Sequence, residues 1–157
     1  MFGLEKRVTI LDFIGFNGPL ILFGIACILM YKKVVVLLTY FIFLGLSIFL
    51  SKIAKQLIKE PRPDRPLAYF VNESHLYLNE ESYGMPSAHA TLAAFSVIYF
   101  YLFLGKWTDP VFIVSMIIYG LTLYQRWKYR RHTILQLFAG TVLGISVGAI
   151  GSMQNKI

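Results

Sequence analysis

Three short polar islands, each at an end of an apolar stretch, hold the residues of this chain that could do chemistry. The first contains Lys55 and Arg62, and the second reads Pro-Ser-Ala-His over residues 86–89. The third contains Arg126 and His132. Phosphoryl transfer needs such cations and imidazoles, because the negative charge on the phosphate oxygens must be held and offset during the reaction. We therefore interpret the three islands as parts of one phosphate-binding site at a membrane surface.

Four of these residues could hold the phosphate. Arg62 and Arg126 each carry a planar fork that binds two phosphate oxygens at once, and Lys55 adds a point charge. Ser87 lies at the predicted start of a helix, where free backbone N–H groups and the helix dipole favour an anion. Together they predict an anion site that gathers several chain segments.

The two histidines of the islands divide the remaining chemistry. Either His89 or His132 could attack phosphorus while the other protonates the leaving group. No Asp, Glu or His cluster with metal-ligand spacing accompanies them, so we predict a metal-free mechanism without a cofactor. Singly, each residue also fits a structural role, since Arg and Lys anchor span ends at headgroups and a histidine often caps a helix. The joint pattern favours catalysis.

The composition is that of an integral membrane protein. Hydrophobic residues make up 57% of the 157 residues and charged residues only 15%, whereas soluble domains have about half and a quarter. The net charge of +7 would suit nucleic acid. However, the basic residues lie between apolar stretches, so we expect lipid headgroups or phosphorylated lipids as partners and no nucleic acid. Cys27 lies in an apolar run and should be a buried small side chain.

We predict an all-α fold, a polytopic transmembrane helical bundle in a single domain over residues 1–157, with about five spans. The expected spans are roughly 13–31, 34–55, 87–105, 110–127 and 132–151, with a polar loop at 61–82. The second helix should stop before Pro61, because a residue that precedes proline disfavours helical backbone. Pro86 suits the first turn of the next helix. The first span is longer than the apolar core of a signal peptide and lacks an obvious cleavage site, so we expect it to be retained.

Some other residues invite a role, and we weigh each against a structural one. Asp12 is a candidate functional carboxylate, but we expect a solvated side chain at the start of a helix. His75 falls in the polar loop, where we expect it to be solvated and outside the site. Glycines recur every four residues in the last span, at Gly140, Gly144 and Gly148. Small residues on one helix face permit close helix packing, which is the role we assign to them.

Five spans would place all three islands on one membrane side, together with the N-terminus. Eleven of the fifteen Lys and Arg residues fall on that side. The positive-inside rule then favours a cytoplasmic site. A phosphate site, however, needs cations on whichever side it works, so the side stays open.

The islands resemble the three signature motifs of the type 2 phosphatidic acid phosphatase (PAP2) superfamily. The family pattern Lys-x6-Arg-Pro is matched by Lys55 and Arg62-Pro63, and Pro-Ser-x-His by residues 86–89. Most of the third pattern, Arg-x5-His-x3-Asp, is matched by Arg126 and His132. The motifs cover only about twenty positions, but three ordered motifs are far more specific than one.

The resemblance implies a role for each residue. By it, His132 is the nucleophile that forms a phosphohistidine, and His89 is the general acid for the leaving group. The phosphate would be held without metal by Lys55, Arg62, Ser87 and Arg126, with a backbone N–H near Ala88 and His89. The family usually has six spans, and the one absent here would be N-terminal.

Two positions depart from the family pattern. Gln136 stands where an Asp usually orients the nucleophilic histidine, and Gln125 where a Ser is usual. The carbonyl of Gln136 could still accept from a ring N–H and fix the tautomer, but it lacks the charge that stabilises an imidazolium. Slower chemistry or an inactive site would follow if nothing replaces that charge.

The segments around the motifs are similar to the dolichyl diphosphatase branch. They read Tyr-Gly-Met-Pro-Ser-Ala-His-Ala over 83–90, His-Thr-Ile-Leu-Gln over 132–136 and Ile-Lys-Glu-Pro-Arg-Pro over 58–63. Gln136 is then a branch feature. The expected function is hydrolysis of a lipid phosphate or diphosphate, with a polyprenyl (dolichyl-type) diphosphate as first choice.

Two alternatives stay open, a phosphatidate- or lipid-A-type phosphatase and a catalytically silent protein that binds lipid. The expected location is a multi-pass position in the endoplasmic reticulum membrane for a eukaryotic or viral source, or in the plasma or inner membrane for a bacterial one.

Overall fold

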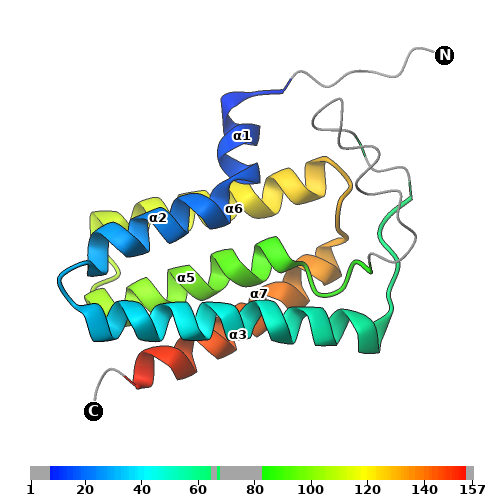
Figure 1. Cartoon of the computed structure of the whole chain (residues 1–157). Coiled ribbons are helices and arrows are strands. Elements are labelled where there is room, and N and C mark those ends of the chain that lie inside the picture. Colours follow the sequence, from blue (N-terminus) through cyan, green and yellow to red (C-terminus); the bar gives the residue numbers. More distant parts are fainter. Residues whose placement is uncertain (1–7, 65–66, 68–82, 155–157) are drawn as a thin grey trace.

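The computed structural model describes residues 8–64, 67 and 83–154, which form six helices and no strand. Five of the helices lie roughly side by side, and α1 stands at an angle to them (Figure 1). The all-α prediction is confirmed for this part of the chain. The predictions for His75 and for most of the polar loop lie outside the described residues.

The first predicted span is broken in two. Helix α1 runs Ile10–Phe16 and α2 runs Gly18–Met30, with a bend of 68° between them. Asn17 ends α1 and caps α2, and Pro19 lies in the first turn of α2, where its missing N–H costs nothing. A Cβ at Gly18 would collide with the side chain of Thr122 on α6, so only glycine permits this approach. The predicted span over 13–31 therefore contains a break at Asn17, and whether the bent pair forms one span stays a prediction.

Helix α3 runs Val34–Ile58, three residues beyond the predicted end of that span. It stops as expected before Pro61, and Lys59 closes it in the left-handed conformation with φ 53°. Most of α3 is apolar and exposed, with only 17% of its most apolar window buried. That surface is typical of a helix that faces lipid.

Helices α5, α6 and α7 run Ala88–Leu104, Pro110–Lys128 and Ile134–Met153. These bounds lie within two residues of the predicted ones, which is the usual uncertainty of helix ends. Ser87 is the N-cap of α5, so Pro86 lies before the helix and outside the first turn in which we expected it. Thr133 caps α7 in a reciprocal box with Gln136.

Helices α5 and α7 pack closely through the glycine face of α7. A Cβ at Gly140 would come within 2.5 Å of the Ser87 carbonyl oxygen, and one at Gly144 would collide with that of Thr91. Gly148 lies against Phe95 in the same way. The backbone of α7 can thus lie directly against α5, as the spacing of the glycines predicts. This contact fixes the start of α5 relative to the start of α7.

An aromatic cluster fills the centre of the bundle. Tyr40 is fully buried and packs against Tyr99, Phe95 and Phe100, at centroid distances of 5.2, 5.3 and 6.3 Å. Its hydroxyl lies 2.8 Å from that of Ser96, which satisfies the buried oxygen. Cys27, by contrast, is only half-buried.

Among the described residues, α3 and α7 are each long and apolar enough to cross a membrane, and α1 with α2 counts as a third candidate if the bent pair is one span. Helix α5 is apolar but shorter. The expected number of about five spans therefore stays a prediction. The ends of α3 and α6 and the starts of α5 and α7 lie together at one end of the bundle (Figure 1).

Candidate active site

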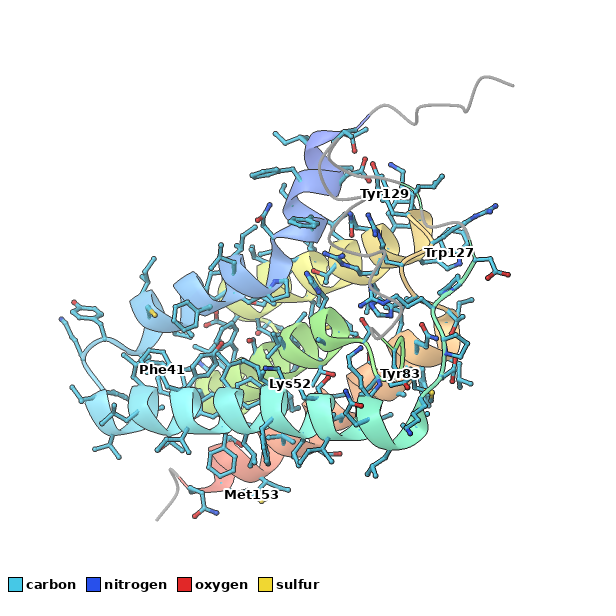
Figure 2. All side chains as sticks on the ribbon, turned by 45° about the vertical axis from the view of Figure 1, so that its right-hand side comes forward. Phe41, Lys52, Tyr83, Trp127, Tyr129 and Met153 are labelled. Carbon is cyan, nitrogen blue, oxygen red and sulfur yellow. The ribbon has the colours of Figure 1, made fainter. Side chains whose placement is uncertain are left out.

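The site is built where these four helix ends meet. Two backbone hydrogen bonds join the segments at the ends of α3, α5 and α7, from Gly84 N to Glu60 O (2.7 Å) and from Ser87 N to Gln136 O (3.0 Å). Tyr83, Trp127 and Tyr129 lie at this end of the molecule, while Phe41 lies at the opposite end (Figure 2). The three polar islands of the sequence thus converge on one region.

Lys55, Arg62 and Arg126 surround the two histidines. Lys55 Nζ donates to the carbonyl oxygen of Tyr83 at 2.8 Å, which directs this side chain toward the start of α5. All three cations act electrostatically on His89 and on His132, and the two imidazoles also act on each other. Three positive charges and two rings in one place are what an anionic headgroup requires.

His89 contacts Arg126 directly. The guanidinium Nη2 lies 2.7 Å from His89 Nε2, and since a guanidinium only donates, the ring nitrogen accepts. Phe16 of α1 lies against both groups, with its ring centroid 4.8 Å from the Arg126 guanidinium carbon and 6.1 Å from the His89 ring centroid. The aromatic face stabilises the cation. Helix α1 therefore forms one wall of the site.

His132 is buried and fixed in orientation. Its Nδ1 lies 3.0 Å from Gly84 O and 3.2 Å from Gln136 Oε1, and both are acceptors. Nδ1 therefore carries the hydrogen, which leaves the lone pair on Nε2. Burial, followed by repulsion from Arg62, Lys55 and Arg126, lowers the pKa of His132 to about 3. At neutral pH the ring is uncharged.

The side chain of Gln136 is fully buried, and both polar atoms of its amide have hydrogen-bond partners. Its Nε2 donates to Glu60 Oε1 at 2.9 Å and to Pro61 O at 2.8 Å. Its Oε1 faces two donors, Thr133 N and His132 Nδ1, both at 3.2 Å. Two acceptors on one side and two donors on the other fix which atom is oxygen.

The start of α5 offers further anion-binding groups. Ser87 makes no side-chain capping bond, and its buried Oγ has no hydrogen-bond partner among the described residues. Ala88 and His89 are the first two helical residues, whose N–H groups have no acceptor within a helix. An unsatisfied buried hydroxyl beside free N–H groups is the arrangement that a phosphate oxygen completes.

Asp12 is not the solvated carboxylate that we expected. It is 1% exposed, and Lys128 Nζ lies 2.6 and 2.7 Å from its two oxygens. It also closes the capping box of α1 with Thr9. Gly15 lets α1 lie directly against Gln125 and the α6 backbone. Asp12 therefore fastens α1 to α6.

Sequence reasoning missed three residues of this region: Glu60, Gly84 and Phe16. Glu60 and Gly84 fall in the segments that we compared with the dolichyl diphosphatase branch, so a signal existed for them. Phe16 lies in a short apolar stretch between Asp12 and Asn17 and carried no signal. A Cβ at Gly84 would lie 2.5 Å from the Gln136 amide, so this glycine makes room for the contact with His132.

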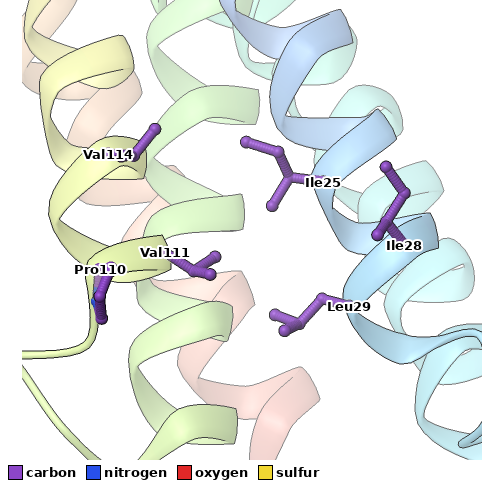
Figure 3. Close-up of a pocket in the computed structure, with 6 residues that line it drawn as sticks. All are labelled: Ile25, Ile28, Leu29, Pro110, Val111 and Val114. Carbon is purple, nitrogen blue, oxygen red and sulfur yellow. The ribbon is translucent and has the colours of Figure 1, made fainter.

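No group of three or more His, Cys, Asp or Glu side chains that could hold a metal occurs among the described residues. An apolar hollow of about 350 Å³ lies between α2 and α6, lined by Ile25, Leu29, Val111 and Val114 among others (Figure 3). It lies beside the start of α6, whereas Arg126 lies near the end of that helix. The hollow is thus separate from the candidate site.

Comparisons with known proteins bear on the family and the fold of this chain. The family model of the PAP2 superfamily matches residues 36–156. Dolichyldiphosphatase 1 of Dictyostelium discoideum is 27% identical over 137 residues, which cover 81% of this chain and 56% of that protein. The chain thus spans just over half the length of this curated relative.

A crystal structure of a transmembrane PAP2 type phosphatidylglycerolphosphate phosphatase from Bacillus subtilis has a similar fold. The TM-score is 0.70 with 22% identity, over 98% of this chain and 80% of that one. At this level of identity the likeness concerns the fold alone. The membrane character of the chain is supported by its own helices, since α3 and α7 are each long and apolar enough to cross a membrane.

Proposed function

Because this chain belongs to the PAP2 superfamily, a family of membrane phosphatases, we propose that it hydrolyses a lipid phosphate or diphosphate through a phosphohistidine. One observation carries the proposal. His132 is neutral, its Nδ1–H is held by two acceptors, and three cations lie around it. A surface histidine needs none of these features.

In the first step, His132 Nε2 attacks phosphorus and forms a P–N bond while the bond from phosphorus to the leaving oxygen breaks. His89 gives that oxygen a proton. In the second step a water attacks the phosphohistidine, His89 takes the water's proton, and His132 leaves as a neutral ring with inorganic phosphate. Lys55, Arg62 and Arg126 hold the phosphate oxygens throughout.

His89 must change its hydrogen bond before it can act as an acid, because its Nε2 now accepts from Arg126. A bound phosphate competes for the guanidinium and offers it two oxygens in place of one ring nitrogen. The negative charge of the phosphate also favours a protonated imidazole beside it. Substrate binding would thus release Arg126 to the phosphate and charge His89 together.

A polyprenyl (dolichyl-type) diphosphate is our first-choice substrate. Gln136 in place of the usual Asp and the segments around the motifs support this choice, as does the similarity to a protein named dolichyldiphosphatase. The second choice is a phosphatidate- or lipid-A-type phosphomonoester. Both substrates present the same terminal phosphoryl group to the site, so the site residues do not distinguish them.

Phosphate release by the purified protein tests the proposal. The panel contains polyprenyl diphosphate, phosphatidate and a lipid A phosphate, each with and without a metal chelator. We expect release from at least one lipid in the presence of chelator, and a loss of about 1,000-fold or more in His132→Ala, because the nucleophile is gone. A thermal unfolding curve of the variant checks that it is folded. Equal inactivity of wild type and variant on all the lipids would favour a silent lipid-binding protein.

A further inference from the structure

We propose that Glu60 is a positioning residue of this enzyme and supplies, through the amide of Gln136, the negative charge that family members place directly on the nucleophilic histidine. The inference rests on the proposed function and deepens it. In this chain the carboxylate is moved one side chain away, and Gln136 transmits its effect to His132.

The contacts form a continuous path. His132 Nδ1–H donates to Gln136 Oε1 at 3.2 Å, and Gln136 Nε2 donates to Glu60 Oε1 at 2.9 Å. Every donor on this path faces an acceptor. Gln136 is fully buried, so no water competes for its amide.

An amide between a carboxylate and an imidazole strengthens both contacts. A carboxylate that accepts from the amide nitrogen draws that N–H dipole toward itself and makes the carbonyl oxygen a better acceptor. The oxygen then stabilises positive charge on His132, and such charge appears when Nε2 becomes bonded to phosphorus. The benefit is larger in the buried site than it would be in water.

The backbone holds Glu60 in place for this contact. Lys59 closes α3 with a positive φ, and the chain then turns so that Glu60 O accepts from Gly84 N at 2.7 Å. Gly84 O in turn accepts from His132 Nδ1, and a side chain at Gly84 would collide with the Gln136 amide. Glu60 and Gly84 thus form one support under His132, built from two segments of the chain.

A purely structural role for Gln136 must be separated from this one, because its Oε1 and N also complete the Thr133 capping box of α7. Glutamate serves that box equally well. Gln136→Glu therefore keeps the cap and an oxygen beside His132, but it sets a second carboxylate against Glu60 and leaves the Pro61 carbonyl without its donor. Because a carboxylate at position 136 lies directly on His132, the relay predicts that Gln136→Glu no longer needs the charge of Glu60. A packing role of Glu60 instead predicts the same loss from Glu60→Gln in either background.

The test uses the full chain in detergent or vesicles. Glu60→Gln removes the charge and keeps the shape, and the exposed Asp64 provides Asp64→Asn as a matched control in the same segment. We expect kcat to fall 10- to 100-fold in Glu60→Gln with KM within threefold, and Asp64→Asn to match the wild type.

The double variant Glu60→Gln/Gln136→Glu exchanges amide and carboxylate, so the introduced amide can donate to a carboxylate that touches His132. It should recover at least tenfold over Glu60→Gln alone, although not fully, because Pro61 O stays unsatisfied. If Glu60→Gln alone does not fold, the double variant is compared with the wild type, and the relay predicts a kcat within about tenfold of it. Wild-type kcat in Glu60→Gln, or a double variant no better than Glu60→Gln, would overturn the relay.

A second readout does not depend on activity. In protein labelled with 15N-histidine, the Nδ1–H resonance of His132 should move in Glu60→Gln and stay in place in Asp64→Asn. If the wild type releases no phosphate from any lipid, the proposed function fails, and this resonance still decides the relay. An unmoved resonance in Glu60→Gln would then reject it.

Discussion

At the residue scale, the state of His132 follows from where it lies. Burial and three nearby cations lower its pKa from the ordinary value of 6.5 to about 3. The ring is therefore neutral over the whole physiological range, as the proposed nucleophilic role requires. Gly84 and Gln136 hold its proton on Nδ1, so Nε2 is the nitrogen that stays available.

This shift makes stability depend on pH in a definite direction. Between pH 6.5 and 3 the unfolded chain binds a proton at His132 that the folded chain does not, so the free energy of unfolding falls as the pH falls. From pH 7 to 5 we expect His132 to account for a loss of about 2 kcal/mol. Unfolding curves of the wild type and of His132→Asn over this range test it. The two proteins should differ less at pH 5 than at pH 7, and parallel curves would contradict the shift.

At the element scale, helix ends were predictable and helix partners were not. Helix boundaries are marked locally by Pro61, Pro110 and the Thr133–Gln136 box. In the structure these helices begin and end within a few residues of the predicted positions. The family motifs also specify the islands by spacing alone. Local patterns carry such information because caps and prolines act on the neighbouring backbone.

Long-range contacts decided the features that the sequence did not reveal. From the sequence we expected Asp12 to be a solvated side chain at a helix start, but it pairs with Lys128, 116 residues later in the chain. In the sequence Glu60 is one charge next to the polar loop, but in the structure it accepts a hydrogen bond from Gln136. The break at Asn17 follows from how closely Gly18 approaches α6. A periodic pattern within one segment carries no information about contacts with residues so distant in the sequence.

Helix α1 gives the prediction at this scale. Its seven residues are too few for a stable helix alone, so it depends on its contacts. Asp12→Asn keeps an oxygen for the cap but leaves the Lys128 cation without a carboxylate partner. The Lys128 side chain is 14% exposed. We expect a loss of about 1–3 kcal/mol, below the full cost of breaking a buried pair because Lys128 reaches solvent.

The loss should extend to catalysis, because Phe16 at the end of α1 touches Arg126 and His89. Unfolding curves and phosphate release measure the two effects. Asp12→Asn/Lys128→Met removes the stranded charge and should recover part of the stability. If Asp12→Asn changes neither stability nor rate, α1 is not fastened by this pair.

At the scale of the whole molecule, the chain separates its chemistry from its lipid-facing surface. The ends that carry the site lie together, while α3 exposes Val35, Ile42 and Phe49 along its length. A lipid substrate suits this division, since its tail can stay among such apolar faces while its phosphate reaches the cations at the end of the bundle. The arrangement requires each of the helices that carry the site to cross the membrane.

Helix α5 provides a direct test of whether the helices that carry the site cross the membrane. Its 17 residues give about 26 Å of helix at about 1.5 Å per residue, close to the hydrocarbon thickness of about 30 Å. If it spans, a cysteine in place of Asp64, before it, and one in place of Trp107, after it, lie on opposite sides. Both positions are exposed, and a Cys27→Ser background leaves one thiol in each protein. A maleimide that cannot cross membranes should therefore label only one of the two in sealed vesicles.

The control is Lys32→Cys. Position 32 precedes the long apolar α3, at the end of that helix opposite to Asp64, so it should lie on the same membrane side as Trp107. Labelling of the Asp64 and Trp107 positions from the same side would mean that α5 re-enters the membrane without crossing it, and the five-span topology would fall. The same reagent also decides which compartment the site faces. Access to Asp64→Cys from the outside of intact cells would favour a site on the extracytoplasmic face. Access only after lysis would favour the cytoplasmic or lumenal face, and inverted plasma-membrane or sealed microsomal vesicles then separate those two, because only a cytoplasmic site is open to the reagent in either.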